Sequence, residues 1–306
     1  MSQYINNNTL FTEPTTKQYG SHMVMTNVML PTKTKYLNID TRYSDNYETV
    51  NAANYNITLP ERINEVKSMK ARCAEIPMSF FNISVQLDNN VFNVTDGLTT
   101  ATYTVPDGFY DNDSLVNAIN AVIQSTSSPF TDLVFSIVNG RSVFTNNGTV
   151  PLDIQFDVSP QGAIDLQNMT YKLGWILGFR GTAYTIGPDG LTLQSNAFVD
   201  FHLPRYLFLV VNEFKNGNPY SFVTLLQNSE INSSQILARI AMDYTRYPFG
   251  TVLRASEEEG YVVSDNRVYT GPVNLQRMNV QLVNERGVPM DLNGLDFSFC
   301  LELTNE

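Results

Sequence analysis

The sequence has little of the chemistry that enzymes use. Its 306 residues include two histidines, two cysteines and one tryptophan. CxxC pairs, HExxH and glycine-rich phosphate-binding motifs are all missing. His22 lies in the N-terminal segment and His202 at the start of a predicted strand, and neither has the neighbouring nucleophile and orienting group of a catalytic triad. These absences predict a protein that is not an enzyme and has no cofactor or metal site. A spatial carboxylate pair of the glycosidase type is not visible in sequence and stays open.

Charge is also scarce. Charged residues make up 16% of the chain, the net charge is −11, and lysine and arginine form no cluster. A nucleic-acid surface needs such a cluster to displace counterions, so direct binding of nucleic acid is not expected. Residues 1–30 contain no long apolar run, and we expect neither a signal peptide nor a membrane span. Cys73 and Cys300 lie far apart in the sequence, and two buried thiols in strands are favoured over a disulfide.

What the chain does contain is apolar and aromatic. Hydrophobic residues account for 42%, with 18 phenylalanines and 16 tyrosines. This suffices for a large core, and an uncharged surface rich in Asn, Thr, Ser and Tyr suits a protein that packs against neighbours. A β-rich extracellular protein with a polar surface fits the same composition equally well.

Alternation of apolar and polar residues predicts strands over much of both ends of the chain. Tyr36–Phe81 indicates three extended pieces, and Pro60 is expected to end the second. Residues 206–211 form a continuous apolar run typical of a strand buried on both faces. Residues 275–283 and 295–303 indicate a terminal antiparallel pair. With about eight or nine strands in these segments, we predict an all-β sandwich, a single jelly roll.

The middle of the chain differs in pattern. Leu115–Ile123 has helical spacing after the capping candidates Asp111–Ser114. Asn139-Gly140 predicts a tight hairpin between two short strands, and a further short helix is expected within 164–177. These elements predict a small α/β module, inserted at 98–194, within a jelly-roll domain of residues 34–97 and 195–306. Residues 1–33 are expected to form an N-terminal arm.

Two groups of residues are candidates for contacts with other molecules. Leu10, Phe11 and Tyr19 give the arm apolar contacts that would order on a neighbouring subunit, although an unattached terminus fits equally well. Tyr244, Tyr247 and Phe249 could line a sugar site or an interface, or simply fill the end of the sandwich. The acidic run 257–259 is interpreted as a solvated turn rather than a cation site.

Three segments resemble capsid proteins of nucleocytoplasmic large DNA viruses. The first is LNIDTRYSDNY (37–47) with NYNITLPERINEVKSMKARCAEIPMSFFNIS (54–84). The second is VPDGFYDNDSLVNAINAVI (105–123) with LGWILGF (173–179), and the third is VNLQRMNVQLVNERGVPMDLNGLDFSFCLEL (273–303). Their order is that of the family, and the set looks most like the penton, the single jelly-roll protein at the five-fold vertex.

This resemblance implies a structural virion protein of an icosahedral capsid. The expected partners are four further copies of the chain in a homopentamer, the major capsid protein and minor capsid proteins, with a spike or fibre on the inserted module. The expected location is the virion, assembled in the cytoplasm of the host cell. Another minor capsid protein, or a spike module that binds a receptor or glycan, is the alternative.

Overall fold

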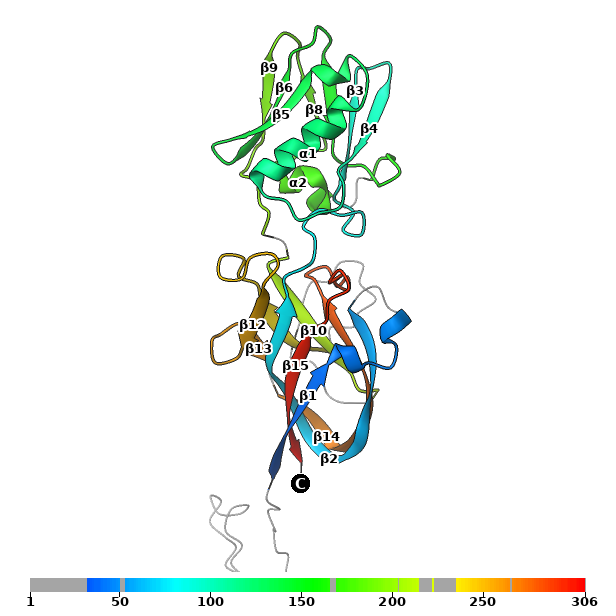
Figure 1. Cartoon of the computed structure of the whole chain (residues 1–306), viewed down its shortest axis with the longest axis vertical. Helices are drawn as coiled ribbons and strands as arrows, with labels where there is room; N and C mark the ends of the chain where they lie inside the picture. Colours follow the sequence, from blue (N-terminus) through cyan, green and yellow to red (C-terminus); the bar gives the residue numbers. More distant parts are fainter. Residues whose placement is uncertain are drawn as a thin grey trace, which may run out of the picture.

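A computed structural model describes residues 32–49, 53–165, 169–202, 204–214, 222, 235–264 and 266–305. The molecule consists of two lobes stacked along its long axis (Figure 1). The described residues of 32–81 and 204–305 form the jelly-roll lobe, and those of 82–202 form the inserted lobe. The chain leaves the jelly-roll lobe after β2 and returns to it at β10.

The jelly-roll lobe is built from antiparallel strands, with two short 3-10 turns, η1 (Thr41–Tyr43) and η2 (Tyr47–Thr49), after the first of them. Its strands are β1 (Lys33–Asp40), β2 (Asn54–Pro77), β10 (Tyr206–Asn212), β11 (Ile236–Ala241), β12 (Val252–Ser256), β13 (Val262–Ser264), β14 (Arg267–Val283) and β15 (Ser298–Asn305).

The pairing of these strands identifies the fold. The second half of β2 pairs with β15 on one side and β12 on the other, and β1 lies beyond β15. The first half of β2 pairs with β14, followed by β10 and β11. The two resulting layers, β1-β15-β2-β12 and β2-β14-β10-β11, combine early and late strands in the order of a jelly roll. The predicted all-β single jelly roll is therefore confirmed.

β2 is longer than the sequence indicates, because Pro60 does not end it. The pairing of β2 with β14 is irregular here: Thr58 opposes Arg277, and the next paired residue, Ile63, opposes Leu275. Pro60 falls in this irregular stretch, so its missing N–H removes no ladder bond. A second irregularity follows at Glu65, whose φ is 58° and whose N–H donates to Asn274 Oδ1 at 3.1 Å.

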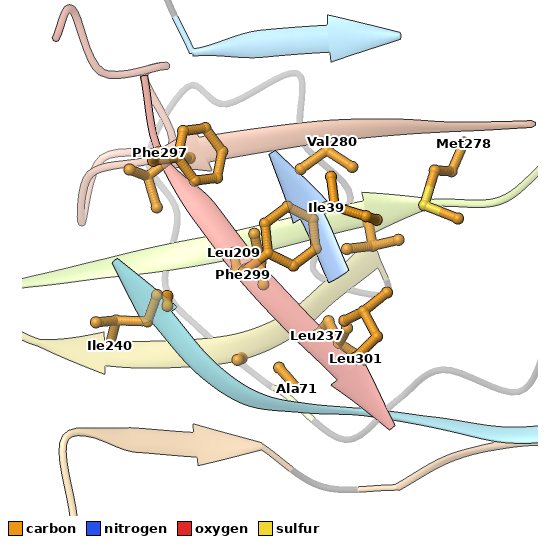
Figure 2. Packing of buried hydrophobic residues seen from close by; sticks show 14 of the residues in the cluster. Ile39, Ala71, Leu209, Leu237, Ile240, Met278, Val280, Phe297, Phe299 and Leu301 are labelled. Atoms are coloured by element: carbon orange, nitrogen blue, oxygen red, sulfur yellow. The ribbon is translucent and has the colours of Figure 1, made fainter. Parts of the chain in front are cut away.

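The core of this lobe lies between the two layers. Inward side chains of β15 alternate with half-exposed ones. Phe299 and Leu301 belong to one core cluster with Leu209, Leu237 and Val280 of the facing layer (Figure 2). The predicted burial of β10 on both faces is confirmed. Leu207, Leu209 and Val211 belong to the main core, whereas Phe208 and Val210 form a second, smaller cluster outside it.

The inserted lobe has its own core. One sheet has the order β4-β3-β7-β8 and the other β5-β6-β9, and α1 covers them (Figure 1). Its elements are β3 (Val91–Thr95), β4 (Thr100–Thr104), α1 (Asn112–Gln124), η3 (Phe130–Asp132), β5 (Leu133–Val138), β6 (Arg141–Asn146), β7 (Leu152–Gln155), η4 (Met169–Tyr171), α2 (Leu173–Ile176), β8 (Ala183–Ile186) and β9 (Leu191–Gln194). Stacked and tilted phenylalanines join the two sheets, including Phe92, Phe144, Phe156 and Phe179.

Two local predictions in this lobe are confirmed. α1 begins at the cap Asp111, whose side chain accepts from the backbone N–H of Ser114, and it buries Leu115, Ile119 and Ile123. Asn139 and Gly140 have φ angles of 51° and 73° and connect β5 to β6, which matches the tight hairpin expected of Asn-Gly.

Other segments differ from expectation. The predicted terminal pair is wrong, because β2 lies between β14 and β15 and pairs with both of them. β3, which the pattern assigned to the jelly roll, pairs with β4 and β7 and belongs to the inserted lobe. Residues 80–87 are irregular rather than extended, because the Asn89 side chain accepts from the Ser84 N–H and donates to the Asn82 carbonyl. β12 forms partly within residues 244–254, where the sequence shows no alternation that predicts a strand, and β8, β9 and β13 were not predicted. The sequence also predicts a strand at 221–226, which lies outside the described residues, apart from Phe222.

Candidate functional site

The three aromatic candidates lie in the loop that joins β11 to β12. Tyr244 is largely buried, donates its hydroxyl to the Pro204 carbonyl at 2.8 Å, and packs edge-on against Phe80 and His202. Burial, with the nearby carboxylates of Glu285 and Asp200 adding to it, raises the pKa of Tyr244. The phenol therefore stays protonated and acts as a fixed donor.

The other two aromatics point to different neighbours. Tyr247 packs edge-on against Tyr261 within the jelly-roll lobe, and Arg246 lies over its ring. Phe249 stacks on Phe109 of the inserted lobe, with ring centroids 4.5 Å apart and planes 17° apart. The three side chains therefore do not converge on one ligand. Tyr244 and Phe249 lie where the two lobes meet, and they help to fix the inserted lobe on the jelly roll.

A cleft of about 390 Å³ opens at this junction. The inserted lobe contributes Trp175 and Arg180, and the jelly-roll lobe contributes Arg205 and Arg286. Arg180 lies over the Trp175 ring at 4.0 Å and donates to the Trp175 and Phe179 carbonyls. Arg286 lies over the Tyr171 ring at 4.5 Å and donates to the Leu87 carbonyl at 3.0 Å. Arg286 thus connects the two lobes, and the guanidinium groups give the cleft fixed walls.

Two carboxylates of the cleft have opposite environments. Burial opposes ionisation of Asp200, but hydrogen bonds from the Arg205 side chain and the His202 backbone outweigh it and lower the pKa of Asp200. Burial raises the pKa of Glu285, and its Oε2 atom has no hydrogen-bond partner within the described part of the chain. Glu285 is therefore protonated more easily than Asp200.

Lys172 is the centre of a buried charge cluster within the inserted lobe. Its side chain is 1% exposed, and its Nζ atom lies 2.5 Å from Asp88 Oδ2 and 3.0 Å from Asp165 Oδ2. Asp88 belongs to the segment that enters the inserted lobe, whereas Lys172 immediately precedes α2. Sequence reasoning missed this cluster because its members lie far apart in the chain and form no motif.

The described residues offer little for catalysis or metal binding. His202 is exposed and its Nδ1 atom lies 3.5 Å from Asp200, whereas His22 lies outside the described residues. In the described ranges, no group of three or more His, Cys, Asp or Glu residues could hold a metal ion. Glu257 is paired with Lys70 and Arg72, and Glu259 with Arg246, so two of the three loop glutamates contact cations of their own chain. Among the described helices, none is long and apolar enough to cross a membrane.

β1 lies at the edge of its layer. Among the described strands it pairs with β15 alone, so its other edge carries backbone groups that no described strand pairs. Large apolar side chains are exposed on this strand and in the loops next to it: Tyr36 is 67% exposed, Tyr43 80% and Leu295 51%. The arm residues Leu10, Phe11 and Tyr19 precede this strand and lie outside the described residues. Their contact with a neighbouring subunit therefore stays a prediction.

Comparison with protein families and with curated proteins finds no match. Among solved structures, the chain is similar to the crystal structure of the mavirus penton protein. The two share 11% sequence identity with a TM-score of 0.46, and the alignment covers 90% of this chain and all of the other. The jelly-roll assignment above rests on the strand order of this chain itself.

Proposed function

We propose that this protein is a structural component of an icosahedral virus capsid, a penton that forms a homopentamer at the five-fold vertices beside major capsid proteins. The inserted lobe faces outward in this arrangement. β1 begins at the opposite end of the subunit, and the residues before it are assigned to contacts with neighbouring subunits.

One observation carries the proposal: two of the three segments that resemble capsid proteins in sequence pair with each other to build the jelly roll. Residues 37–84 supply half of β1 and all of β2, and residues 273–303 supply most of β14 and β15. In the structure, β2 pairs with both β14 and β15, and β15 pairs with β1. The resemblance therefore covers a spatially continuous frame rather than scattered motifs.

The shape of the molecule supports an upright subunit. Lys33 at the start of β1 is paired with Asn305 near the end of the chain, at the end of the jelly roll opposite the inserted lobe (Figure 1). Contacts between subunits of a stable ring should each bury on the order of 1,000 Å² or more. The long sides of the jelly roll and its β1 edge offer the surface for such contacts.

The test is the mass of the purified chain in solution by light scattering, with and without residues 1–31. This deletion leaves β1 intact. A particle of five chains that is lost on truncation supports both the pentamer and the role of the arm. A pentamer that survives truncation contradicts the role of the arm alone.

If light scattering finds a monomer, a second measurement decides the question: a reconstruction of the virion at low symmetry. Density for this chain at the five-fold vertices supports the proposal even if the free chain is monomeric. Density at other capsid positions contradicts the penton role and favours a different minor capsid protein.

The second candidate is a spike module that binds a glycan. The observation that favours it is the junction cleft, where Trp175 and Tyr171 present aromatic rings next to charged side chains. Binding on a glycan array that is lost in Trp175→Ala, but kept in Phe198→Ala, would support this candidate. Absence of binding by the intact protein would count against it.

A further inference from the structure

The two cysteines of the chain lie directly opposite each other. In the antiparallel pairing of β2 with β15, Cys73 is the partner of Cys300. Both are free and half-buried, and the Cys300 thiol donates to the Leu301 carbonyl at 3.9 Å. They form the middle of a row across one layer, between Asn38 of β1 and Ser256 of β12.

This placement suits a covalent bond. Opposed residues in antiparallel strands have Cα atoms about 4.5–5.5 Å apart, and a disulfide requires about 4.4–6.8 Å. The side chains of opposed residues project from the same face of a sheet. The pairing also shifts directly after Cys300, so that Arg72 has no partner on β15. This bulge gives the backbone local freedom to adjust.

We propose that Cys73 and Cys300 are a modification site, at which a small-molecule disulfide such as oxidised glutathione forms an intrachain bond between β2 and β15. The thiolate of one cysteine attacks the small disulfide, forms a mixed disulfide and releases one small thiolate. The second cysteine then attacks the protein sulfur of the mixed disulfide and releases the second thiolate. Two protein thiols are oxidised and one small disulfide is reduced to two thiols.

The bond would link an early strand of the jelly roll to its last strand. β15 lies between β1 and β2, so a link from β15 to β2 fixes the final strand to the strand that spans both layers. The link also joins positions far apart in the sequence, which restricts the unfolded chain and favours the folded one. The proposal does not depend on the penton role.

The local charges set the rate of the reaction. Burial raises the pKa of both thiols, and Glu75 adds to this effect, whereas Arg72 opposes it. The other charged side chains nearby are Glu302, Glu257 and Lys70, which are paired with Arg72 or with each other. Because exchange requires the thiolate, oxidation should be slow near neutral pH and faster as the pH rises.

The experiment uses the full chain, purified in reduced form and incubated with oxidised glutathione at several pH values. The expected product has no free thiol on denaturation, a mass lower by about two hydrogen atoms, and a peptide that joins Cys73 to Cys300. Its melting temperature should rise, and the reaction should accelerate with pH.

Cys73→Ser and Cys300→Ser serve as matched controls. Each should melt like the reduced wild type and accept one glutathione without a rise in melting temperature. If a serine variant does not fold, thiol counting and peptide mapping of the wild type still decide the question. Persistence of two glutathione adducts, of two free thiols, or a bond between two chains would overturn the proposal.

Discussion

At the scale of single residues, the jelly-roll lobe contains a buried ion pair, Arg267 with Glu213. Arg267 and Glu213 are 4% and 5% exposed, and Arg267 Nη1 lies 2.7 Å from Glu213 Oε2. Arg267 also donates to the carbonyls of Val211 and Gln235, so it joins β14 to the residues beside β10 and β11. Each charge is tolerated in the interior only because the other is present.

Removing one partner of this pair should therefore be severe. Glu213→Ala leaves Arg267 as an uncompensated buried cation, and we expect it to lower the free energy of unfolding by about 3–5 kcal/mol. Urea denaturation would measure this. Glu259→Ala is the control, because Glu259 pairs with Arg246 at the surface and its loss should change the midpoint little. Equal effects of the two substitutions would contradict the argument.

Glu285 predicts a dependence of stability on pH. Burial raises its pKa in the folded protein, so the folded state holds the proton more tightly than the unfolded state does. The stability that protonation provides is complete below the unfolded pKa of about 4.3 and is lost as the pH rises through the folded pKa.

Glu285→Gln removes this charge, so the variant should gain stability relative to wild type as the pH rises from about 4 to about 7. Paired denaturation curves across that range would measure the gain. Asp96→Asn should lose stability relative to wild type as the pH rises. Backbone hydrogen bonds lower the pKa of Asp96, so its ionised form stabilises the wild type, and this stabilisation is lost as the pH falls. A constant difference between Glu285→Gln and wild type would refute the prediction.

At the scale of secondary-structure elements, residues close in sequence determine where α1 of the inserted lobe begins. Asp111 and Ser114 form a reciprocal capping box at the start of α1. The Asp111 carboxylate accepts from the Ser114 backbone N–H, and the Ser114 hydroxyl oxygen accepts from the Asp111 backbone N–H.

Asp111→Ala should lower the free energy of unfolding by about 1 kcal/mol, because it leaves N-terminal N–H groups of the helix without an acceptor. Asp113→Ala is the matched control, since Asp113 lies in the same first turn but is not the cap. The comparison is made by thermal unfolding, and equal losses would show that charge alone accounts for the effect.

The sequence predicted elements well where the information was local. The helix at Leu115–Ile123, the Asn139-Gly140 hairpin and the buried strand from Tyr206 all follow from neighbouring residues. Prediction failed where a partner far along the chain decides the outcome. β2 continues past Pro60 because β14 accommodates an irregularity there, and Lys172 is buried as an ion pair because folding brings Asp88 and Asp165 to it.

The junction between the lobes organises the whole molecule. Phe109 and Phe249 are contributed by different lobes, and their stacking is a contact that neither lobe can make alone. In a double-mutant cycle with Phe109→Ala and Phe249→Ala, we expect a coupling of about 0.5–1.5 kcal/mol in the free energy of unfolding. Limited proteolysis of each variant should show faster cleavage near residues 82–90, where the chain enters the inserted lobe.

Phe198→Ala is the control for this prediction. Phe198 is 62% exposed and lies beneath Arg141 within the inserted lobe, so its loss should not couple to Phe249→Ala. Additive effects of Phe109→Ala and Phe249→Ala would mean that the stacked pair does not hold the lobes together.

The pairing of Lys33 with Asn305 has a mechanical consequence. Both ends of the described chain lie at the same end of one antiparallel ladder, in which the hydrogen bonds run across the strands. A pull that separates these two ends loads the bonds one after another, as in a zipper, rather than all together. If one neighbour holds the residues before β1 and another contact holds the end of β15, a force that separates these two points would peel β1 from β15 at low load while the rest of the jelly roll stays intact.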